Sequence, residues 1–224
     1  MTLNREELAR QVNALDRDLP HTPDGRRTFF DSVYDRAEGD PAYVPWADLK
    51  PKPELSEWLA ANPGKGRTAI DIACGLGDNA EVIAAAGWQT TAFDLSDTAI
   101  RWARRRFAAS RVAYQCASLL DPPSYWLGGF DLVNECYTIQ SVPPDLHVRF
   151  MQAIAALVRP GGTLLVYTRT RAEGSAPSGP PWPLMPSETG WFGQNGFRQV
   201  SEKPFVQERP DRRIAHLFSA WEKA

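Results

Sequence analysis

The sequence predicts an α/β fold built on a mostly parallel sheet, and three features lead to this prediction. Residues 68–94 read as a buried strand, a glycine turn, a helix and a second strand. Further apolar runs at 112–116, 130–133 and 163–168 alternate with helical patterns, as in a sheet with crossover helices. The last two runs, 197–205 and 214–221, flank a short charged turn and predict a hairpin, so the final strand should be antiparallel.

Length and composition agree with one domain spanning residues 1–224. With 224 residues and 43% hydrophobic side chains, the chain can bury a substantial core, and no run is apolar enough to cross a membrane. The net charge of −2 gives no general attraction for nucleic acid or an anionic membrane. The polar N-terminus lacks a signal-peptide pattern, and the three cysteines lack metal-ligand spacing. We therefore expect a cytoplasmic protein with free thiols and no metal, and make no prediction of its oligomeric state.

Before the first strand, the sequence predicts a helical and aromatic cap over residues 1–62, with the sheet core in 63–224. Residues 4–16 place apolar side chains on one helical face. An aromatic and proline-rich segment follows at 29–53, and it should cover a surface because loops rarely carry so many exposed rings. A short helix at 54–61 then leads into the sheet.

The central motif begins at Asp71, within the first strand at 68–72, where a carboxylate is costly unless it is hydrogen-bonded. Gly75 and Gly77 permit a turn with positive φ and close approach of a ligand, and the following helix points free amides at the same place. Asp94 ends the second strand, where an acid can accept hydrogen bonds from both hydroxyls of a ribose. These residues predict a site for a ribose-bearing ligand.

The stretch from Asp71 to Gly77 resembles motif I of class I S-adenosylmethionine-dependent methyltransferases, with Ala73 where that family usually has its first glycine. The turn Pro160-Gly-Gly before the strand at 163–168 is similar to another turn of the same superfamily. An acid at Asp71 suits a donor that carries an ammonium and a sulfonium, but it would face the pyrophosphate of a dinucleotide. The resemblance implies S-adenosylmethionine as cofactor and a Rossmann-like seven-stranded mixed sheet, order 3-2-1-4-5-7-6, with helices on both faces.

The resemblance also implies which residues contact the cofactor. The segment with Tyr34 and Trp46 is similar to the N-terminal part of small-molecule methyltransferases of the thiol and thiopurine type, where aromatic rings pack over the cofactor. In the family an acid commonly follows the third strand and binds the adenine, whereas here Ser118 or backbone groups would do so. The expected cofactor contacts are Asp71, Ala73, Gly75, Gly77, Asp94, Leu95, Ser118, Leu119, Glu135, Tyr34 and Trp46.

Candidate catalytic residues follow the fourth strand and begin the next helix. Glu135 can reach the methionine half of the cofactor or the acceptor, and Tyr137 can line the acceptor pocket or pack as a buried ring. His147 is a natural general base, although a lone histidine in the first turn of a helix is more often simply exposed. The region from Arg169 to Pro186, which contains a glycine- and proline-rich loop from residue 174, should determine which acceptor binds. The expected pocket residues are Tyr137, Gln140, Trp182 and Met185.

The predicted function is in-line methyl transfer from S-adenosylmethionine to a small acceptor, with a thiol and a natural-product hydroxyl or amine as the candidate acceptor groups. The fourth strand is not followed by a proline-shaped turn, which argues against nucleic-acid substrates, and the arginine-rich helix at 97–109 is typical of a solvated face. One alternative is an NAD(P)-binding reductase, which explains Asp94 and the glycines but not Asp71. The other is a non-catalytic S-adenosylmethionine-binding protein, which would keep the motifs without turnover.

Overall fold

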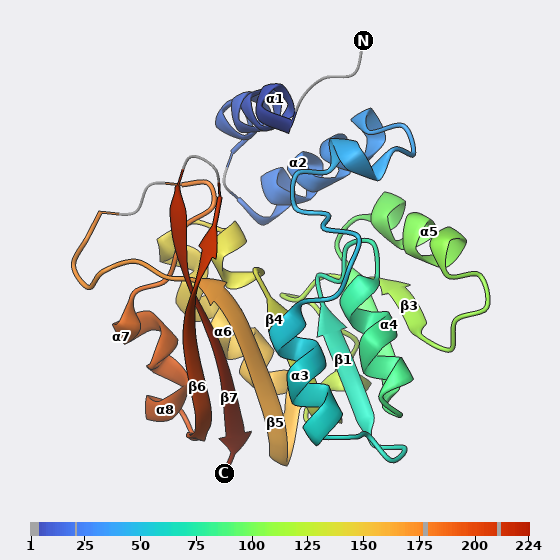
Figure 1. Ribbon diagram of the computed structural model, residues 1–224, viewed down its shortest axis with the longest axis vertical. Coiled ribbons are helices and arrows are strands. Elements are labelled where there is room, and N and C mark those ends of the chain that lie inside the picture. Colours follow the sequence, from blue (N-terminus) through green and yellow to red (C-terminus); the bar gives the residue numbers. More distant parts are fainter. Residues whose placement is uncertain (1–4, 21, 177–178, 210–211) are drawn as a thin grey trace.

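The computed structural model describes residues 5–20, 22–176, 179–209 and 212–224. Its seven-stranded sheet has the order β3-β2-β1-β4-β5-β7-β6, and β7 runs antiparallel to both β5 and β6 (Figure 1). The predicted fold class, strand order and antiparallel last strand are confirmed. The strands are β1 Thr68–Ile72, β2 Gln89–Asp94, β3 Ala113–Cys116, β4 Phe130–Cys136, β5 Val158–Arg169, β6 Phe197–Glu208 and β7 Arg213–Lys223.

Helices cover both faces of this sheet. Alternate residues of β1 separate the two sides: Ile70 and Ile72 face the core beneath α6 and α8, whereas Ala69 faces the core beneath α3 and α4. These helices are α3 Pro53–Ala61, α4 Asp78–Ala85, α5 Asp97–Arg106, α6 Pro144–Leu157, α7 Pro186–Thr189 and α8 Trp191–Gln194. Short 3₁₀ turns are η1 Pro41–Tyr43, η2 Ser124–Trp126 and η3 Ile139–Ser141. None of the helices in the described ranges has both the length and the apolar character needed to cross a bilayer.

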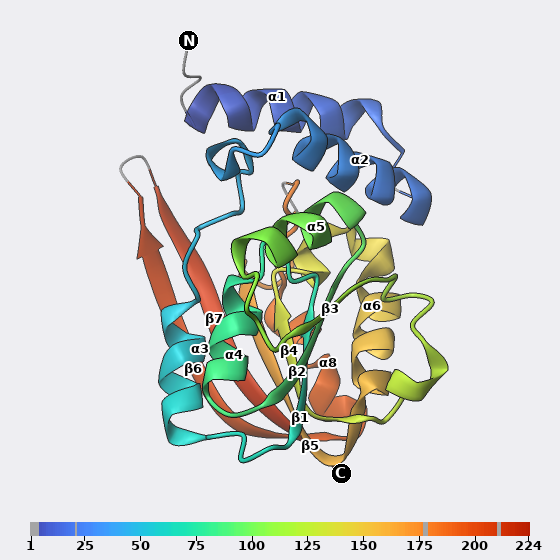
Figure 2. The same cartoon turned by 90° about the vertical axis from the view of Figure 1, so that its right-hand side faces the viewer.

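Two further helices, α1 Arg5–Asp18 and α2 Pro23–Arg36, lie across the end of the sheet where the parallel strands finish (Figure 2). The helix predicted at 4–16 corresponds to α1, although residue 4 lies outside the described ranges. No helix was predicted at α2, where the rings of 29–34 had suggested only a covering segment. Its signal is Thr22, whose hydroxyl caps the amide of Gly25 at 3.2 Å, with Pro23 in the first turn.

Other elements differ from the prediction in extent, and β4 and β6 each end three residues later than expected. The helix expected at 97–109 ends at Arg106, and two short helices, α7 and α8, meet at Gly190 after the proline-rich loop. β5 begins at Val158 rather than at residue 163, because the pairing with β4 shifts register between Phe130 and Leu132 and lets the turn residues join the strand. None of these differences changes which strand ends meet at the site.

Candidate active site

The glycine turn between β1 and α4 has the backbone that its sequence predicts. Gly75 and Gly77 adopt φ of 53° and 90°, and Ala73 adopts φ of 49°. A Cβ on Gly77 would lie 2.4 Å from the hydroxyl oxygen of Tyr114, so this position needs glycine for space as well as for φ. Ala73 occupies the left-handed region without being glycine, which costs about 1 to 2 kcal/mol.

Asp71 lies beneath this turn and is 1% exposed. Its Oδ1 accepts a hydrogen bond from Asn134 Nδ2 at 2.7 Å, while its Oδ2 is buried without a partner among the described residues. Burial raises the pKa of Asp71 to about 7, and the bond from Asn134 opposes that rise. Asn134 on β4 was not among the predicted site residues. The unpartnered oxygen is a place where a ligand's cation or donor could bind.

Asp94 connects the end of β2 to the glycine turn. Its Oδ2 accepts from the Gly75 amide and its Oδ1 from the Ser96 amide, both at 2.9 Å. Burial raises the pKa of Asp94 to about 6, and the two amide bonds oppose the rise. A carboxylate oxygen has more than one acceptor position, so Asp94 keeps the capacity to accept from ligand hydroxyls.

The predicted aromatic pair of the cap reaches the same turn. Trp46 Nε1 donates to Tyr34 Oη at 2.9 Å, and the two rings meet edge to face at 5.8 Å. A Cβ added to Gly75 would lie 3.2 Å from Tyr34 Oη, so the tyrosine hydroxyl sits directly beside the turn. Burial, and then the charge of Asp94, raise the pKa of Tyr34. The structure therefore brings Tyr34 and Trp46 to the glycine turn.

The loop after β3 flanks Asp94, and its polar groups largely bond to one another. The carbonyl of Asp94 accepts from the Ala117 amide at 3.0 Å, and the carbonyl of Leu95 lies 3.6 Å from Cys116 Sγ. Ser118 Oγ accepts from the Leu120 amide at 3.2 Å. Leu119 is 6% exposed and packs in the core on the α6 side. The contacts of Ser118 and Leu119 with an adenine therefore stay predictions.

Glu135 is completely buried near the end of β4. Its Oε1 accepts from the amides of Thr138 and Ile139 at 2.6 and 3.1 Å, which holds η3 against the strand. Its Oε2 has no partner among the described residues, and burial raises the pKa of Glu135 to about 7. Strand alternation puts Glu135 on the α6 side of the sheet, opposite Asn134 and Asp71.

Tyr137 follows β4 in the left-handed region, with φ of 66°, which is strained for a large side chain. Its Oη lies 2.8 Å from Nε2 of His216, whose Nδ1 lies 2.8 Å from the carbonyl oxygen of Ile214. Because a carbonyl only accepts, Nδ1 carries the proton and Nε2 accepts the hydrogen bond from the tyrosine hydroxyl. Burial lowers the pKa of His216, which keeps the ring neutral.

Two cations face the ring of Tyr137, and neither was predicted. Lys52 Nζ lies 4.7 Å from the ring centroid and the Arg169 guanidinium carbon lies 5.8 Å from it. Lys52 precedes α3 and Arg169 ends β5, so the fold gathers them from sequence positions far apart. This end of β4 is therefore electropositive.

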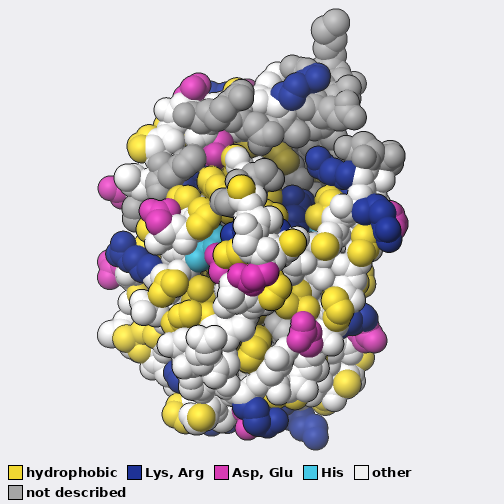
Figure 3. Space-filling model, turned by 90° about the vertical axis from the view of Figure 1, so that its left-hand side faces the viewer, with side chains coloured by type: hydrophobic (Ala, Val, Ile, Leu, Met, Phe, Trp, Pro, Cys, Tyr) yellow, Lys and Arg dark blue, Asp and Glu magenta, His cyan; other side chains and the backbone are white. Residues whose placement is uncertain are grey.

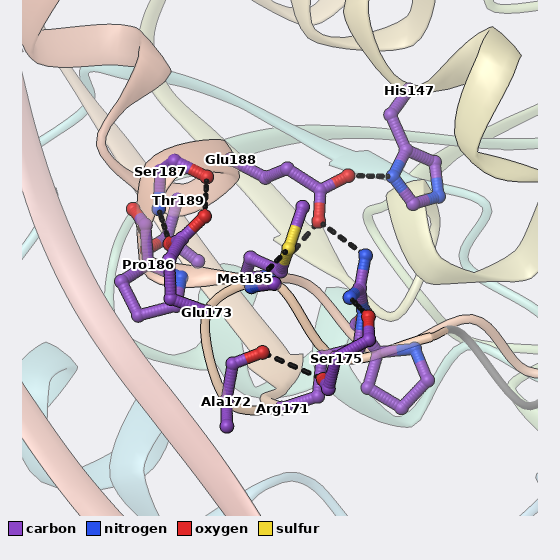
Figure 4. A network of polar contacts seen from close by, with 12 residues as sticks. His147, Arg171, Ala172, Glu173, Ser175, Met185, Pro186, Ser187, Glu188 and Thr189 are labelled. Carbon is purple, nitrogen blue, oxygen red and sulfur yellow. Dashed lines mark hydrogen bonds and ion pairs between the residues drawn. The ribbon is translucent and has the colours of Figure 1, made fainter.

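His147 is 1% exposed, so the expectation of an exposed histidine is wrong. Its Nδ1 lies 2.6 Å from Glu188 Oε1 (Figure 4), and its Nε2 lies 2.9 Å from the Val142 carbonyl oxygen. Both ring nitrogens are thus engaged, which leaves neither to take a proton from an acceptor. Glu188 also accepts from Arg171 and from the Met185 amide, at 3.3 and 2.8 Å. Met185 belongs to this network, which ties the loop after β5 to α6.

Gln140 and Trp182 link the same loop to the sheet and the cap. Gln140 Oε1 accepts from Thr168 Oγ1 and from the Arg169 amide at 3.1 and 2.6 Å, and its carbonyl accepts from the Trp182 amide at 2.8 Å. Trp182 is 8% exposed, with the guanidinium of Arg26 from α2 5.8 Å from its ring. Gln140 thus orients the end of β5, and Trp182 holds the loop beneath the cap.

The face of the molecule that carries α7 and α8 has a mixed charge distribution. In Figure 3, Lys and Arg side chains on this face lie among Asp, Glu and hydrophobic side chains, without a large area of one charge sign.

Within the arginine-rich α5, Arg106 makes two 2.8 Å contacts with Asp78 of α4, and Arg104 bonds to the carbonyl of Tyr114. Part of that helix therefore docks onto neighbouring elements instead of forming a wholly solvated face.

Comparison with known proteins agrees with this geometry. Residues 69–162 match the family described as a methyltransferase domain. A curated relative, ubiquinone biosynthesis O-methyltransferase from Aromatoleum aromaticum, is 34% identical over 132 residues, 56% of this chain and 56% of the relative. The chain thus spans about half the length of the curated relatives it matches.

Two solved structures share the fold. The 1,6-didemethyltoxoflavin-N1-methyltransferase of Burkholderia thailandensis, solved with S-adenosylhomocysteine, aligns with a TM-score of 0.65 at 19% identity, covering 88% of this chain and 87% of the other. The magnesium protoporphyrin IX methyltransferase of Synechocystis PCC 6803, solved with bound S-adenosylmethionine, aligns with a TM-score of 0.67 at 14% identity, covering 89% and 97%.

Proposed function

Because the chain carries a methyltransferase domain of the class I, S-adenosylmethionine-dependent type, we propose that it transfers a methyl group from S-adenosylmethionine to a hydroxyl group of a small molecule. The observation that carries this proposal is a pair of buried carboxylates at one glycine turn. Asp71 and Asp94 come from the adjacent parallel strands β1 and β2, and Asp71 keeps an oxygen without a described partner.

The two carboxylates fit the two ends of such a donor. Asp71 Oδ2 offers an acceptor to an ammonium group, and the ionised form that binds it is favoured once a positive charge lies nearby. Asp94 offers its remaining acceptor positions to ribose hydroxyls. When bound, the donor supplies a methyl group on a sulfonium. A dinucleotide would bring a pyrophosphate toward the Asp71 carboxylate, so the reductase alternative is disfavoured by like charge.

The acceptor side favours a hydroxyl over a thiol. A hydroxyl that attacks a methyl group must lose a proton, and Tyr137 can accept it while passing its own proton to Nε2 of His216. A thiol has an ordinary pKa of about 8.5 and would need this relay far less. The curated relatives that match part of the chain are named ubiquinone biosynthesis O-methyltransferases, which supports an oxygen atom as the acceptor.

The test follows methyl transfer from labelled S-adenosylmethionine to a panel of phenols and alcohols, each paired with the corresponding thiol. We expect Tyr137→Phe to lower kcat on a hydroxyl acceptor by about 10²- to 10⁴-fold, the usual contribution of a positioned proton acceptor, with unchanged affinity for S-adenosylhomocysteine. Tyr125→Phe is the control, since Tyr125 is 71% exposed. Turnover confined to thiols, or untouched by Tyr137→Phe, refutes the hydroxyl assignment. Absence of turnover on this panel and on a matching set of amines favours the non-catalytic alternative.

A further inference from the structure

Arg169 ends β5 with its charge uncompensated. Among the described residues, no carboxylate oxygen lies within 4.0 Å of its guanidinium, and its Nε is buried without a hydrogen-bond partner. Its backbone is fixed on both sides, because its amide donates to Gln140 Oε1 at 2.6 Å and its carbonyl accepts from the Leu184 amide at 3.0 Å. Arg169 is partly buried, and a partly desolvated cation without a nearby carboxylate is costly, so an anion that binds here would remove part of that cost.

The surroundings of Arg169 add positive charge. Lys52 is 9% exposed and faces the same Tyr137 ring, and its Nζ contacts one carboxylate, Asp48, at 2.6 Å. Burial, followed by the charges of Arg212 and Arg209, lowers the pKa of Arg169, and Tyr137 opposes this change. Among the described residues, Asp48 is the one carboxylate within 4.0 Å of the Lys52 ammonium, and none lies that close to the Arg169 guanidinium.

This electropositive cluster borders the proposed donor site on its acceptor side. The amide of Lys52 donates to Asn79 Oδ1 at 3.1 Å, and Asn79 lies in the first turn of α4, directly after the glycine turn. On β4, Asn134 contacts Asp71, and Tyr137 follows three residues later. An acceptor at Tyr137 would thus have the donor on one side and Arg169 on the other.

We infer that Arg169, assisted by Lys52, binds a carboxylate of the acceptor, so that the substrate is a small hydroxy acid whose hydroxyl lies at Tyr137. The inference rests on the proposed function. A guanidinium presents N–H donors in a planar fork that matches the two oxygens of a carboxylate, and such charge-assisted bonds are the strong ones. Arg169 then holds the carboxylate of the substrate, and Tyr137, positioned by His216, accepts the proton that the substrate hydroxyl loses.

The probes are three phenolic acids, 4-hydroxyphenylacetate, 4-hydroxybenzoate and salicylate, each paired with its uncharged primary amide. Calorimetry measures their binding to protein saturated with S-adenosylhomocysteine. In at least one pair, we expect the acid to bind about tenfold tighter or more than its amide. Arg169→Gln should remove this preference and Arg169→Lys should keep part of it. Arg198→Gln, a control at an exposed pair with Glu222, should keep all of it.

A second measurement uses only the natural protein, so it does not depend on whether a variant folds. In the unaltered protein, the advantage of the acid over its amide should shrink as ionic strength rises, because salt screens the attraction. The inference is overturned if no pair shows a preference for the acid, if the preference survives Arg169→Gln, or if salt leaves it unchanged. S-adenosylhomocysteine is titrated first in every experiment. If it binds and the acids gain nothing, only the inference fails, whereas a protein that does not bind it contradicts the proposed function itself.

Discussion

Replacing Asp71 by asparagine should change how stability depends on pH in the protein without ligand. The carboxyl has a pKa of about 7 in the folded chain and an ordinary value of 3.8. Between these values the folded state holds the proton more tightly than the unfolded state, so stability falls as pH rises through the folded pKa. From pH 5 to pH 8 this single group should cost the folded state about 2 to 3 kcal/mol. Asp71→Asn keeps the shape and removes that dependence.

Urea unfolding at pH 5, 6, 7 and 8 measures the effect, with the difference between the natural protein and Asp71→Asn taken at each pH. The variant should gain about 2 to 3 kcal/mol on the natural protein between pH 5 and pH 8, whatever constant offset the new amide introduces. Asp131→Asn is the control, because Thr68 and Arg159 hold the pKa of Asp131 below its usual value and it stays ionised in this range. Parallel pH profiles for Asp71→Asn and the natural protein would show that burial does not raise the pKa of the Asp71 carboxyl.

Two further predictions concern the glycine turn. Gly77→Ala should destabilise the protein by about 2 kcal/mol or more, because the Cβ would lie 2.4 Å from Tyr114 Oη at a φ of 90°. Adding Tyr114→Phe to this variant should recover part of the loss, as measured by urea unfolding. Equal stability of the single and the double variant would contradict the steric cause. Ala73→Gly should be neutral or stabilising by up to about 1 kcal/mol, since φ at this position is 49°, whereas Ala84→Gly inside α4 should cost about 1 kcal/mol. Equal losses for the two would refute strain at Ala73.

The parts of the site that could be predicted from sequence lie close together along the chain. Asp71, Gly75, Gly77 and Asp94 belong to one strand, turn, helix and strand, so local pattern and the family resemblance were enough to place them. The α2 helix was open to the same reasoning through the cap at Thr22, but the aromatic residues that follow drew attention to surface covering instead.

The remaining groups depend on strand order, which periodicity does not reveal. Asn134 meets Asp71 because β4 pairs with β1, 63 residues along the chain. His216 reaches Tyr137 because β7 pairs with β5, although the two residues are 79 positions apart in the sequence. His147 is buried because Glu188, in the short helix α7, lies against it. In each case a polar side chain that looked isolated in the sequence finds its partner through tertiary packing.

The most direct test of this account is a calorimetric titration of S-adenosylhomocysteine into the natural protein and into Asp94→Asn. The account predicts one-to-one binding by the natural protein, and affinity weakened about tenfold or more in the variant, because an amide cannot accept on both sides as the carboxylate does. A melting curve confirms that the variant is folded. Absence of binding by the natural protein, or equal affinity in the two proteins, would contradict the assignment of this site to the methyl donor.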